Sequence, residues 1–191
     1  MKKLGLLLLA IAAITLLLGG VVVAQNIGDN SVYFTTYYSN ANTSGAPDAT
    51  VRVINDGDTG ANLWAAFYVF DDSQELTQCC SCVITPDGLL SESVNKQLTA
   101  YPLTGKKLQR GVIKLISSST GDPTNDKPTA GLRAWSTHIQ KATGTAYAVT
   151  ETPFADSNLV AKEQTLLQEL CYFDGLLSGL PCTCTPEDHD F

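Results

Sequence analysis

The stretch Thr50-Val-Arg-Val-Ile-Asn55 and its continuation decide the fold: a turn, Asn55-Asp-Gly-Asp-Thr-Gly60, follows it, and then the apolar segment 62–70. The first segment alternates between apolar and polar side chains, as a half-buried strand does. The Asn, Asp and Gly residues between the two segments favour a turn. The pair therefore predicts a β-hairpin with a longer loop.

Similar short segments fill most of the chain. Further strands are predicted at 31–39, 75–84, 90–98, 111–117, 131–140 and 146–152, with turns at 86–88 and 121–123. Short strands at this spacing, without helices between them, favour an antiparallel sandwich over a parallel α/β sheet. The predicted fold class is therefore mainly β, an antiparallel β-sandwich of Ig-like or jelly-roll-like type.

One segment near the C-terminus has helical periodicity. Ser157 can cap this helix, and the apolar side chains predicted to share its face are Leu159, Leu166, Leu167, Leu170 and Phe173. An irregular tail follows from residue 175. We expect a sandwich over 25–156, with the helix and tail of 157–191 packed on it.

The N-terminus has the pattern of a secretory signal peptide. Lys2 and Lys3 precede an almost unbroken apolar run, and Ala24 ends the segment before Gln25. Residues 1–24 are therefore predicted to be removed on export, which gives a secreted, extracellular or periplasmic protein. The alternative is a retained membrane anchor, since about 20 apolar residues can span a bilayer.

The charge of the chain is strongly acidic. Twelve Lys and Arg stand against 19 Asp and Glu, a net charge of −7, and losing the two leader lysines leaves 10 against 19, or −9. This balance argues against nucleic acid and anionic lipid as partners. Membrane contact is expected only during export, unless the leader is retained.

Six cysteines form two groups of three: Cys79, Cys80 and Cys82 in a predicted strand, and Cys171, Cys182 and Cys184 near the C-terminus. An even number in an exported chain predicts disulfides. Pairs within the strand group are disfavoured, because strand residues i and i+3 lie about 10 Å apart whereas bridged Cα atoms lie within about 7 Å. Three bonds between the groups are therefore expected, each closing a loop of about 90 residues.

The alternation of strand side chains complicates this arrangement. Cys80 and Cys82 should share one face of the strand while Cys79 points to the other. Either one bond goes round an edge of the sheet, or the strand bulges, and we predict a bulge at Cys79-Cys80. Zinc or copper(I) thiolate ligation and redox activity are the alternative uses of these cysteines, but export and the strand context favour disulfides.

Other polar groups suggest chemistry only weakly, and no catalytic residue is predicted. Ser136 and His138 fall on one strand face, as a nucleophile and its base could, but no nucleophile elbow accompanies them. Paired carboxylates such as those of Asp71, Asp72 and Glu75 can hydrolyse glycosides, although a charged turn explains them equally well.

No cofactor is predicted, and calcium is the alternative. Hard oxygen ligands occur in two loops, with Asp56 and Asp58 in one and Asp122 and Asp126 in the other. Neither loop completes the known calcium-loop pattern. Ordinary turn chemistry is the alternative explanation for both.

Several segments resemble a group of uncharacterised exported bacterial proteins over roughly residues 50–140. The residues that carry the resemblance are Tyr68-Val-Phe-Asp-Asp, Cys79-Cys-Ser-Cys, Thr85-Pro-Asp-Gly-Leu, Ser93-Val-Asn and Arg133-Ala-Trp-Ser-Thr-His. The resemblance implies a bacterial origin and export to the periplasm or the cell exterior. It implies no activity.

The expected function is therefore non-enzymatic: a secreted or cell-surface structural or adhesive protein that binds or assembles through exposed strand edges and loops. The partner would be a second copy or a cell-surface molecule, and the segment 31–39 could add to a neighbouring sheet. A carbohydrate- or calcium-binding module is the alternative, followed by a hydrolase.

Overall fold

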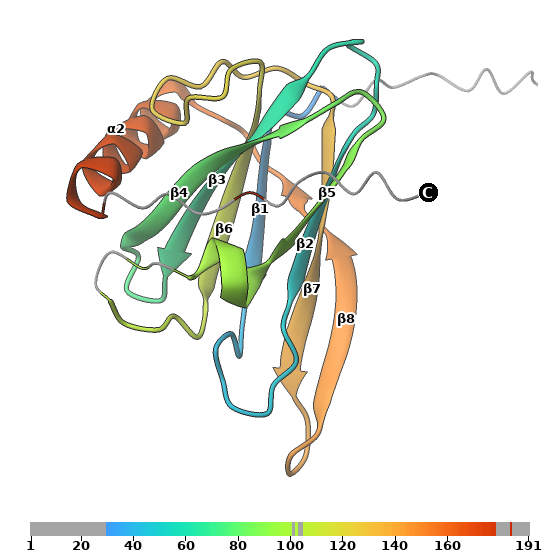
Figure 1. The fold of residues 1–191 in the computed structure, drawn as a ribbon, viewed down its shortest axis with the longest axis vertical. Coiled ribbons are helices and arrows are strands. Elements are labelled where there is room, and N and C mark those ends of the chain that lie inside the picture. The colour runs from blue at the N-terminus through green and yellow to red at the C-terminus, as the bar shows by residue number, and fades with distance from the viewer. Residues whose placement is uncertain (1–29, 101, 103–104, 179–183, 185–191) are drawn as a thin grey trace, which may run out of the picture.

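The computed structural model describes residues 30–100, 102, 105–178 and 184, which form two antiparallel sheets and one long helix (Figure 1). The five-stranded sheet has the order β4 (Leu76–Ile84), β3 (Leu63–Asp71), β6 (Gly111–Ser118), β1 (Tyr33–Tyr38) and β9 (Ala155–Asp156). The four-stranded sheet has the order β5 (Leu89–Ser93), β2 (Thr50–Asn55), β7 (Leu132–Lys141) and β8 (Tyr147–Pro153). The predicted mainly β, sandwich-like fold is confirmed.

The predicted hairpin between residues 50–55 and 62–70 is wrong. Its two strands belong to different sheets, because β2 pairs with β5 and β7 whereas β3 pairs with β4 and β6. Asn55, which is 1% exposed, stabilises this crossing by donating from its side-chain amide to the carbonyls of Ala61 (3.0 Å) and Ile84 (3.1 Å). The turn residues were identified correctly, but they connect two layers of the sandwich.

The main core lies between the two sheets. Val51 and Val53 of β2 contribute to it from one sheet, and Phe67 of β3 and Leu115 of β6 from the other, all fully buried. Their spacing of two along each strand places them on the inward faces. The apolar residues of β2 therefore alternate with polar ones because only one face of this strand lies against the core.

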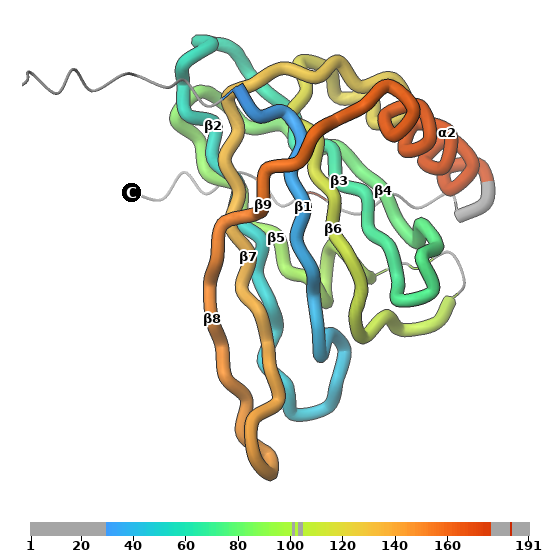
Figure 2. Tube along the Cα trace, turned by 180° about the vertical axis from the view of Figure 1, so that it is seen from behind, coloured from blue at the N-terminus to red at the C-terminus, as the bar shows by residue number. Residues whose placement is uncertain are grey.

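Strand β3 is buried on both of its faces. A second apolar cluster on the outer face of the five-stranded sheet includes Ala66 and Tyr68, while Ala65 and Phe67 face the main core. Helix α2 (Ala161–Ser178) covers this outer face, as Figure 2 shows from behind. A strand with both faces covered has a continuous apolar sequence, which explains why β3 does not alternate.

The helix prediction is correct in type but wrong in detail. Helix α2 begins at Ala161. Leu159, Leu167 and Leu170 pack on the outer cluster of the sheet as predicted, whereas Leu166 is 45% and Phe173 57% exposed. Ser157 does not cap the helix, since its backbone N–H donates to Tyr33 and its hydroxyl bonds with that of Thr35.

Helix α2 is also held to the sheet by a polar contact. Glu163 accepts hydrogen bonds from the Tyr33 hydroxyl (3.0 Å) and the Lys114 ammonium (2.5 Å). Burial acts to raise the pKa of Glu163, but these two bonds outweigh it and lower the pKa. The carboxylate is therefore held ionised against the sheet.

Two other predicted strands differ from expectation. The segment 90–98 is a strand only as far as Ser93, and a single π-helical turn, η1 (Val94–Leu98), follows it. Strand β1 is paired along its whole length with β6 and at two residues with β9, so it is not a free edge. The predicted leader lies outside the described residues, and no described helix is long and apolar enough to cross a membrane.

Candidate functional site

The first disulfide joins β4 to helix α2. Cys79 and Cys171 are bonded with their Cα atoms 5.8 Å apart, and both lie in the apolar cluster beneath the helix. The bond crosses a sequence separation of 92 residues. It therefore fixes the helix to the outer face of the five-stranded sheet.

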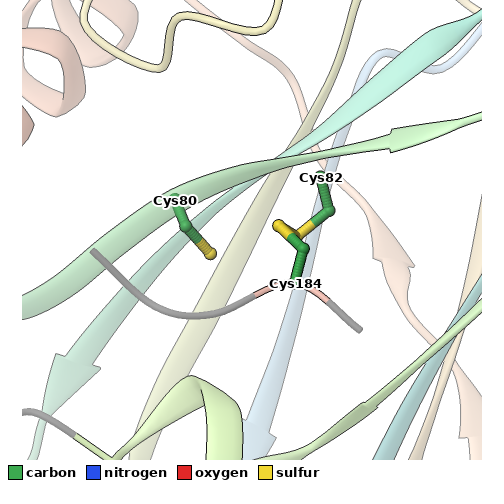
Figure 3. A group of neighbouring side chains, drawn as sticks. All are labelled: Cys80, Cys82 and Cys184. Carbon is green, nitrogen blue, oxygen red and sulfur yellow. A yellow bond between two sulfur atoms is a disulfide. The ribbon is translucent and has the colours of Figure 1, made fainter. Parts of the chain in front are cut away.

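The second disulfide lies on the opposite face of β4. Cys82, which is buried in the main core, is bonded to Cys184 with their Cα atoms 5.5 Å apart (Figure 3). The Cys184 sulfur also lies 3.4 Å from the carbonyl oxygen of Ser81. Cys80 is disulfide-bonded as well, and Cys182 lies outside the described residues.

Both described bonds run between the two cysteine groups, and Cys79 faces away from Cys80 and Cys82, as alternation predicts. The predicted bulge at Cys79-Cys80 is wrong. The irregularity of this strand pair lies between Val69 and Phe70, opposite the segment 76–78. No bulge is needed because Cys171 and Cys184 bond to β4 on opposite faces.

The sulfur atoms of Cys80, Cys82 and Cys184 lie within 4.8 Å of one another. Among the described residues this is the one group of three Cys, His, Asp or Glu side chains placed to share a metal ion. Thiolate, not disulfide sulfur, is the ligand that zinc and copper(I) require. With no free cysteine among the described residues, this cluster is a covalent tie.

The calcium candidates make turns and local contacts. Asp56 accepts from the backbone N–H of Asp58 and lies 3.4 Å from Arg133, while Asp122 accepts from the backbone and hydroxyl of Thr124. Asp126 is 1% exposed and receives hydrogen bonds from helix α2. In the described chain, these four carboxylates do not meet in a group of three.

Ser136 and His138 do not form a catalytic pair. The Ser136 hydroxyl donates to the carbonyl of Thr137, and the His138 Nε2 bonds instead to the Thr152 hydroxyl at 2.8 Å. His138 is stacked on Tyr37 with ring centroids 4.1 Å apart, and its burial lowers its pKa. The histidine therefore has the environment of a packed side chain.

Asp71 and Asp72 border a cavity of about 530 Å³. Asp71 accepts hydrogen bonds from the backbone N–H groups of Ser73 (2.8 Å) and Glu75 (3.1 Å), as a turn residue does. Arg110 donates to Asp72 at 2.8 Å and lowers the pKa of this carboxyl. A glycosidase acid needs a raised pKa, so Asp72 has the wrong shift for that role.

The sequence could not identify two features of the surface. The cavity beside Asp71 is lined by three separate segments, 39–43, 71–72 and 106–110, which no local motif connects. Strand β8 was predicted as a strand, but its position at the end of a sheet depends on the topology. The adjacent lysines Lys106 and Lys107 were the only available signal for the cavity.

Comparisons with known proteins give little further information. No protein-family model and no curated protein sequence matches the chain. The chain is similar to a solved structure, the crystal structure of Thermotoga maritima 1070, with 13% sequence identity and a TM-score of 0.44 over 69% of this chain and 97% of that one. This likeness supports no argument about function.

Proposed function

We propose that this chain is an exported, non-enzymatic bacterial protein that works by binding or assembly, and that strand β8 accepts a strand from another polypeptide. Its leader sequence and its disulfides support the extracellular or periplasmic location. The observation that carries the proposal is the open edge of β8, which pairs with β7 on one side and has no described strand on the other.

The backbone of β8 is arranged to receive a strand. Ala146 accepts from the N–H of Ala142, and Phe154 donates to Ala134, so the even-numbered residues bond to β7. Partners alternate along an antiparallel strand. The N–H groups of Tyr147, Val149 and Glu151 therefore point away from the sheet.

The usual protections of an edge strand are weak along β8. Natural edges carry charges, bulges or prolines that prevent pairing. The one proline of β8, Pro153, is its last residue. Its single charged residue, Glu151, is paired with Arg52 of β2 at 2.5 Å, and Val149 is 55% exposed. Figures 1 and 2 show the β7–β8 hairpin extending beyond the rest of the sandwich, where another chain can reach it.

Two proline substitutions test the proposal. Val149→Pro removes an N–H that faces outward, so the fold should remain stable while association is lost. Ala148→Pro is the matched control, because it removes an N–H that bonds to β7 and should lower the melting temperature instead. Light scattering after size-exclusion chromatography, with electron microscopy, measures association, and pull-down from cell surfaces measures partner binding.

The outcomes separate clearly. Association or surface binding by the wild type that Val149→Pro abolishes supports strand addition. A wild type that stays monomeric and captures no surface component contradicts the proposal. Equal association by the wild type and Val149→Pro places the contact elsewhere and also contradicts it.

A further inference from the structure

The cavity beside Asp71 is separate from the β8 edge, and the strand register explains its position. Tyr38 of β1 and Asp71 of β3 both pair with Gly111 of β6, so these three residues form one row across the sheet. The segments that follow β1 and β3 and the segment that precedes β6 therefore emerge side by side. Side chains of these three segments line the cavity of about 530 Å³.

The walls of the cavity are joined to one another. The N–H of Ala41 donates to the carbonyl of Gln109 at 3.0 Å. The side-chain amide of Asn42 donates to the carbonyl of Leu108 at 2.9 Å. The Leu108 side chain is 4% exposed and anchors this wall in the main core. The cavity is therefore formed before any ligand arrives, which reduces the entropy lost on binding.

The charge of the cavity differs from that of the whole molecule. Lys106, Lys107 and Arg110 line it against two carboxylates, those of Asp71 and Asp72, in a chain whose net charge is −7. Asp71 accepts from backbone groups and Asp72 is paired with Arg110, so three cations against two carboxylates leave an excess of one positive charge. The excess positive charge favours an anionic ligand over a cationic one.

The rest of the lining indicates a ligand rich in hydroxyl groups. Leu108 is its one apolar residue, and Asn40, Thr43 and Gln109 supply amide and hydroxyl groups that both donate and accept hydrogen bonds. The volume lies within the range of about 300–1,000 Å³ that is usual for small-molecule sites. We propose that this cavity binds an acidic saccharide, whose carboxylate contacts Lys106 and Lys107 and whose hydroxyl groups contact the amides and carboxylates around them.

Titration calorimetry of the oxidised protein with a galacturonic acid trimer tests this assignment. A neutral galactose trimer, a glutamate tripeptide and inorganic sulfate are the comparison ligands. We expect the acidic trimer to bind at least about tenfold more tightly than each of the three, because charge and hydroxyl groups are recognised together. The double variant Lys106→Gln with Lys107→Gln should weaken its binding by about tenfold or more.

The matched control is Lys127→Gln with Lys162→Gln, which removes the same charge away from the cavity and should change affinity by less than about twofold. Equal binding of sulfate or of the peptide would show a general anion site and overturn the saccharide assignment. Equal binding of the neutral trimer, no binding of the acidic trimer, or full binding by the Lys106 and Lys107 variant would also overturn it. Circular dichroism of each variant confirms that its fold is retained.

Discussion

At the scale of single residues, Gly111 occupies a position with no room for a side chain. The Tyr38 hydroxyl passes over this glycine to donate to the carbonyl of Phe70 at 3.1 Å. A Cβ at Gly111 would lie 1.9 Å from that carbonyl oxygen and 2.8 Å from the Tyr38 hydroxyl. The backbone of β3 cannot move aside without breaking its pairing with β6, so glycine is required here.

Gly111→Ala should therefore lower the free energy of unfolding by about 3 kcal/mol or more, measured by urea denaturation. Gly175→Ala is the control, since nothing lies within 4 Å of its added Cβ and alanine is the better helix former. That variant should raise stability by up to about 1 kcal/mol. Equal effects of the two substitutions would contradict the close strand approach at Gly111.

His138 should make stability depend on pH. Burial lowers its pKa from the ordinary value of 6.5, although a hydrogen bond with the backbone of Tyr37 partly opposes the shift. The unfolded chain therefore binds a proton more readily, and stability falls as the pH drops below 6.5 until the folded pKa is also passed.

Replacing His138 with Gln tests this dependence. Between about pH 7.5 and pH 5, the wild type should lose more unfolding free energy than His138→Gln, whose side chain can still bond to Thr152. Urea denaturation across this range measures both proteins. Parallel pH profiles would show that His138 does not contribute.

The sequence predicted residue roles well where strand alternation alone determines them. Cys79 lies on the face opposite Cys80 and Cys82, as expected. Ser136 and His138 share a face too. The sequence could not show that His138 would bond to Thr152 and stack on Tyr37. Contacts between distant segments depend on register, which a local pattern does not contain.

At the scale of elements, type was easier to predict than partner. The strand at 50–55 was identified, but its pairing was assigned to the next strand in the chain, whereas the polar contacts of Asn55 stabilise a crossing between sheets. In helix α2 the predicted apolar face was right for Leu167 and Leu170 and wrong for Leu166 and Phe173, which are exposed. Cys171, bonded to Cys79, lies on the same face as Leu167, so the disulfide and the apolar contacts fix the same orientation of the helix.

Removing the bond between Cys79 and Cys171 should cost less than its sequence separation of 92 suggests. While the bond from Cys82 to Cys184 is intact, the bond between Cys79 and Cys171 closes only a short loop. That loop runs over the three residues from Cys79 to Cys82 and the 13 residues from Cys171 to Cys184. Closing a loop of that size adds about 3 kcal/mol to the free energy of unfolding, whereas closing a loop near 92 residues adds about 4.5 kcal/mol.

The double substitution Cys79→Ala with Cys171→Ala should therefore lower unfolding free energy by about 3 kcal/mol at most from chain entropy. Cys82→Ala with Cys184→Ala is the matched comparison and should cost a similar amount alone. Every variant carries Cys80→Ala with Cys182→Ala as background, because Cys80 is disulfide-bonded too and a third bond would shorten the loops. In this background, removing both bonds should cost more than the two separate losses together, because the second removal releases a loop of about 92 residues rather than a short one. Simple additivity in urea denaturation would contradict this coupling.

At the scale of the whole molecule, the sandwich-like class followed from strand spacing, whereas the open edge and the cavity did not. Both depend on which strands end each sheet and which loops meet at one end. The strand order places β8 last and brings Tyr38, Gly111 and Asp71 into one row. Topology, more than composition, therefore determines where the open edge and the cavity lie.

The acidic charge of the chain should make any self-association through β8 depend on salt. Two copies that each carry a net charge of −7, or −9 without the leader, repel one another as they approach. Such a contact would be formed by backbone groups and uncharged side chains of β8, since Glu151 is already paired with Arg52. Screening should therefore weaken the repulsion and leave the contact almost unchanged.

The oligomeric fraction should rise between about 20 mM and 300 mM sodium chloride, as the screening length falls to about 10 Å and below. Sedimentation velocity at fixed protein concentration measures this fraction, and Val149→Pro should remain monomeric at every salt concentration. A fraction that falls with salt would indicate a contact made by opposite charges, which the uncharged edge of β8 does not provide. That result would place the assembly surface on another part of the molecule.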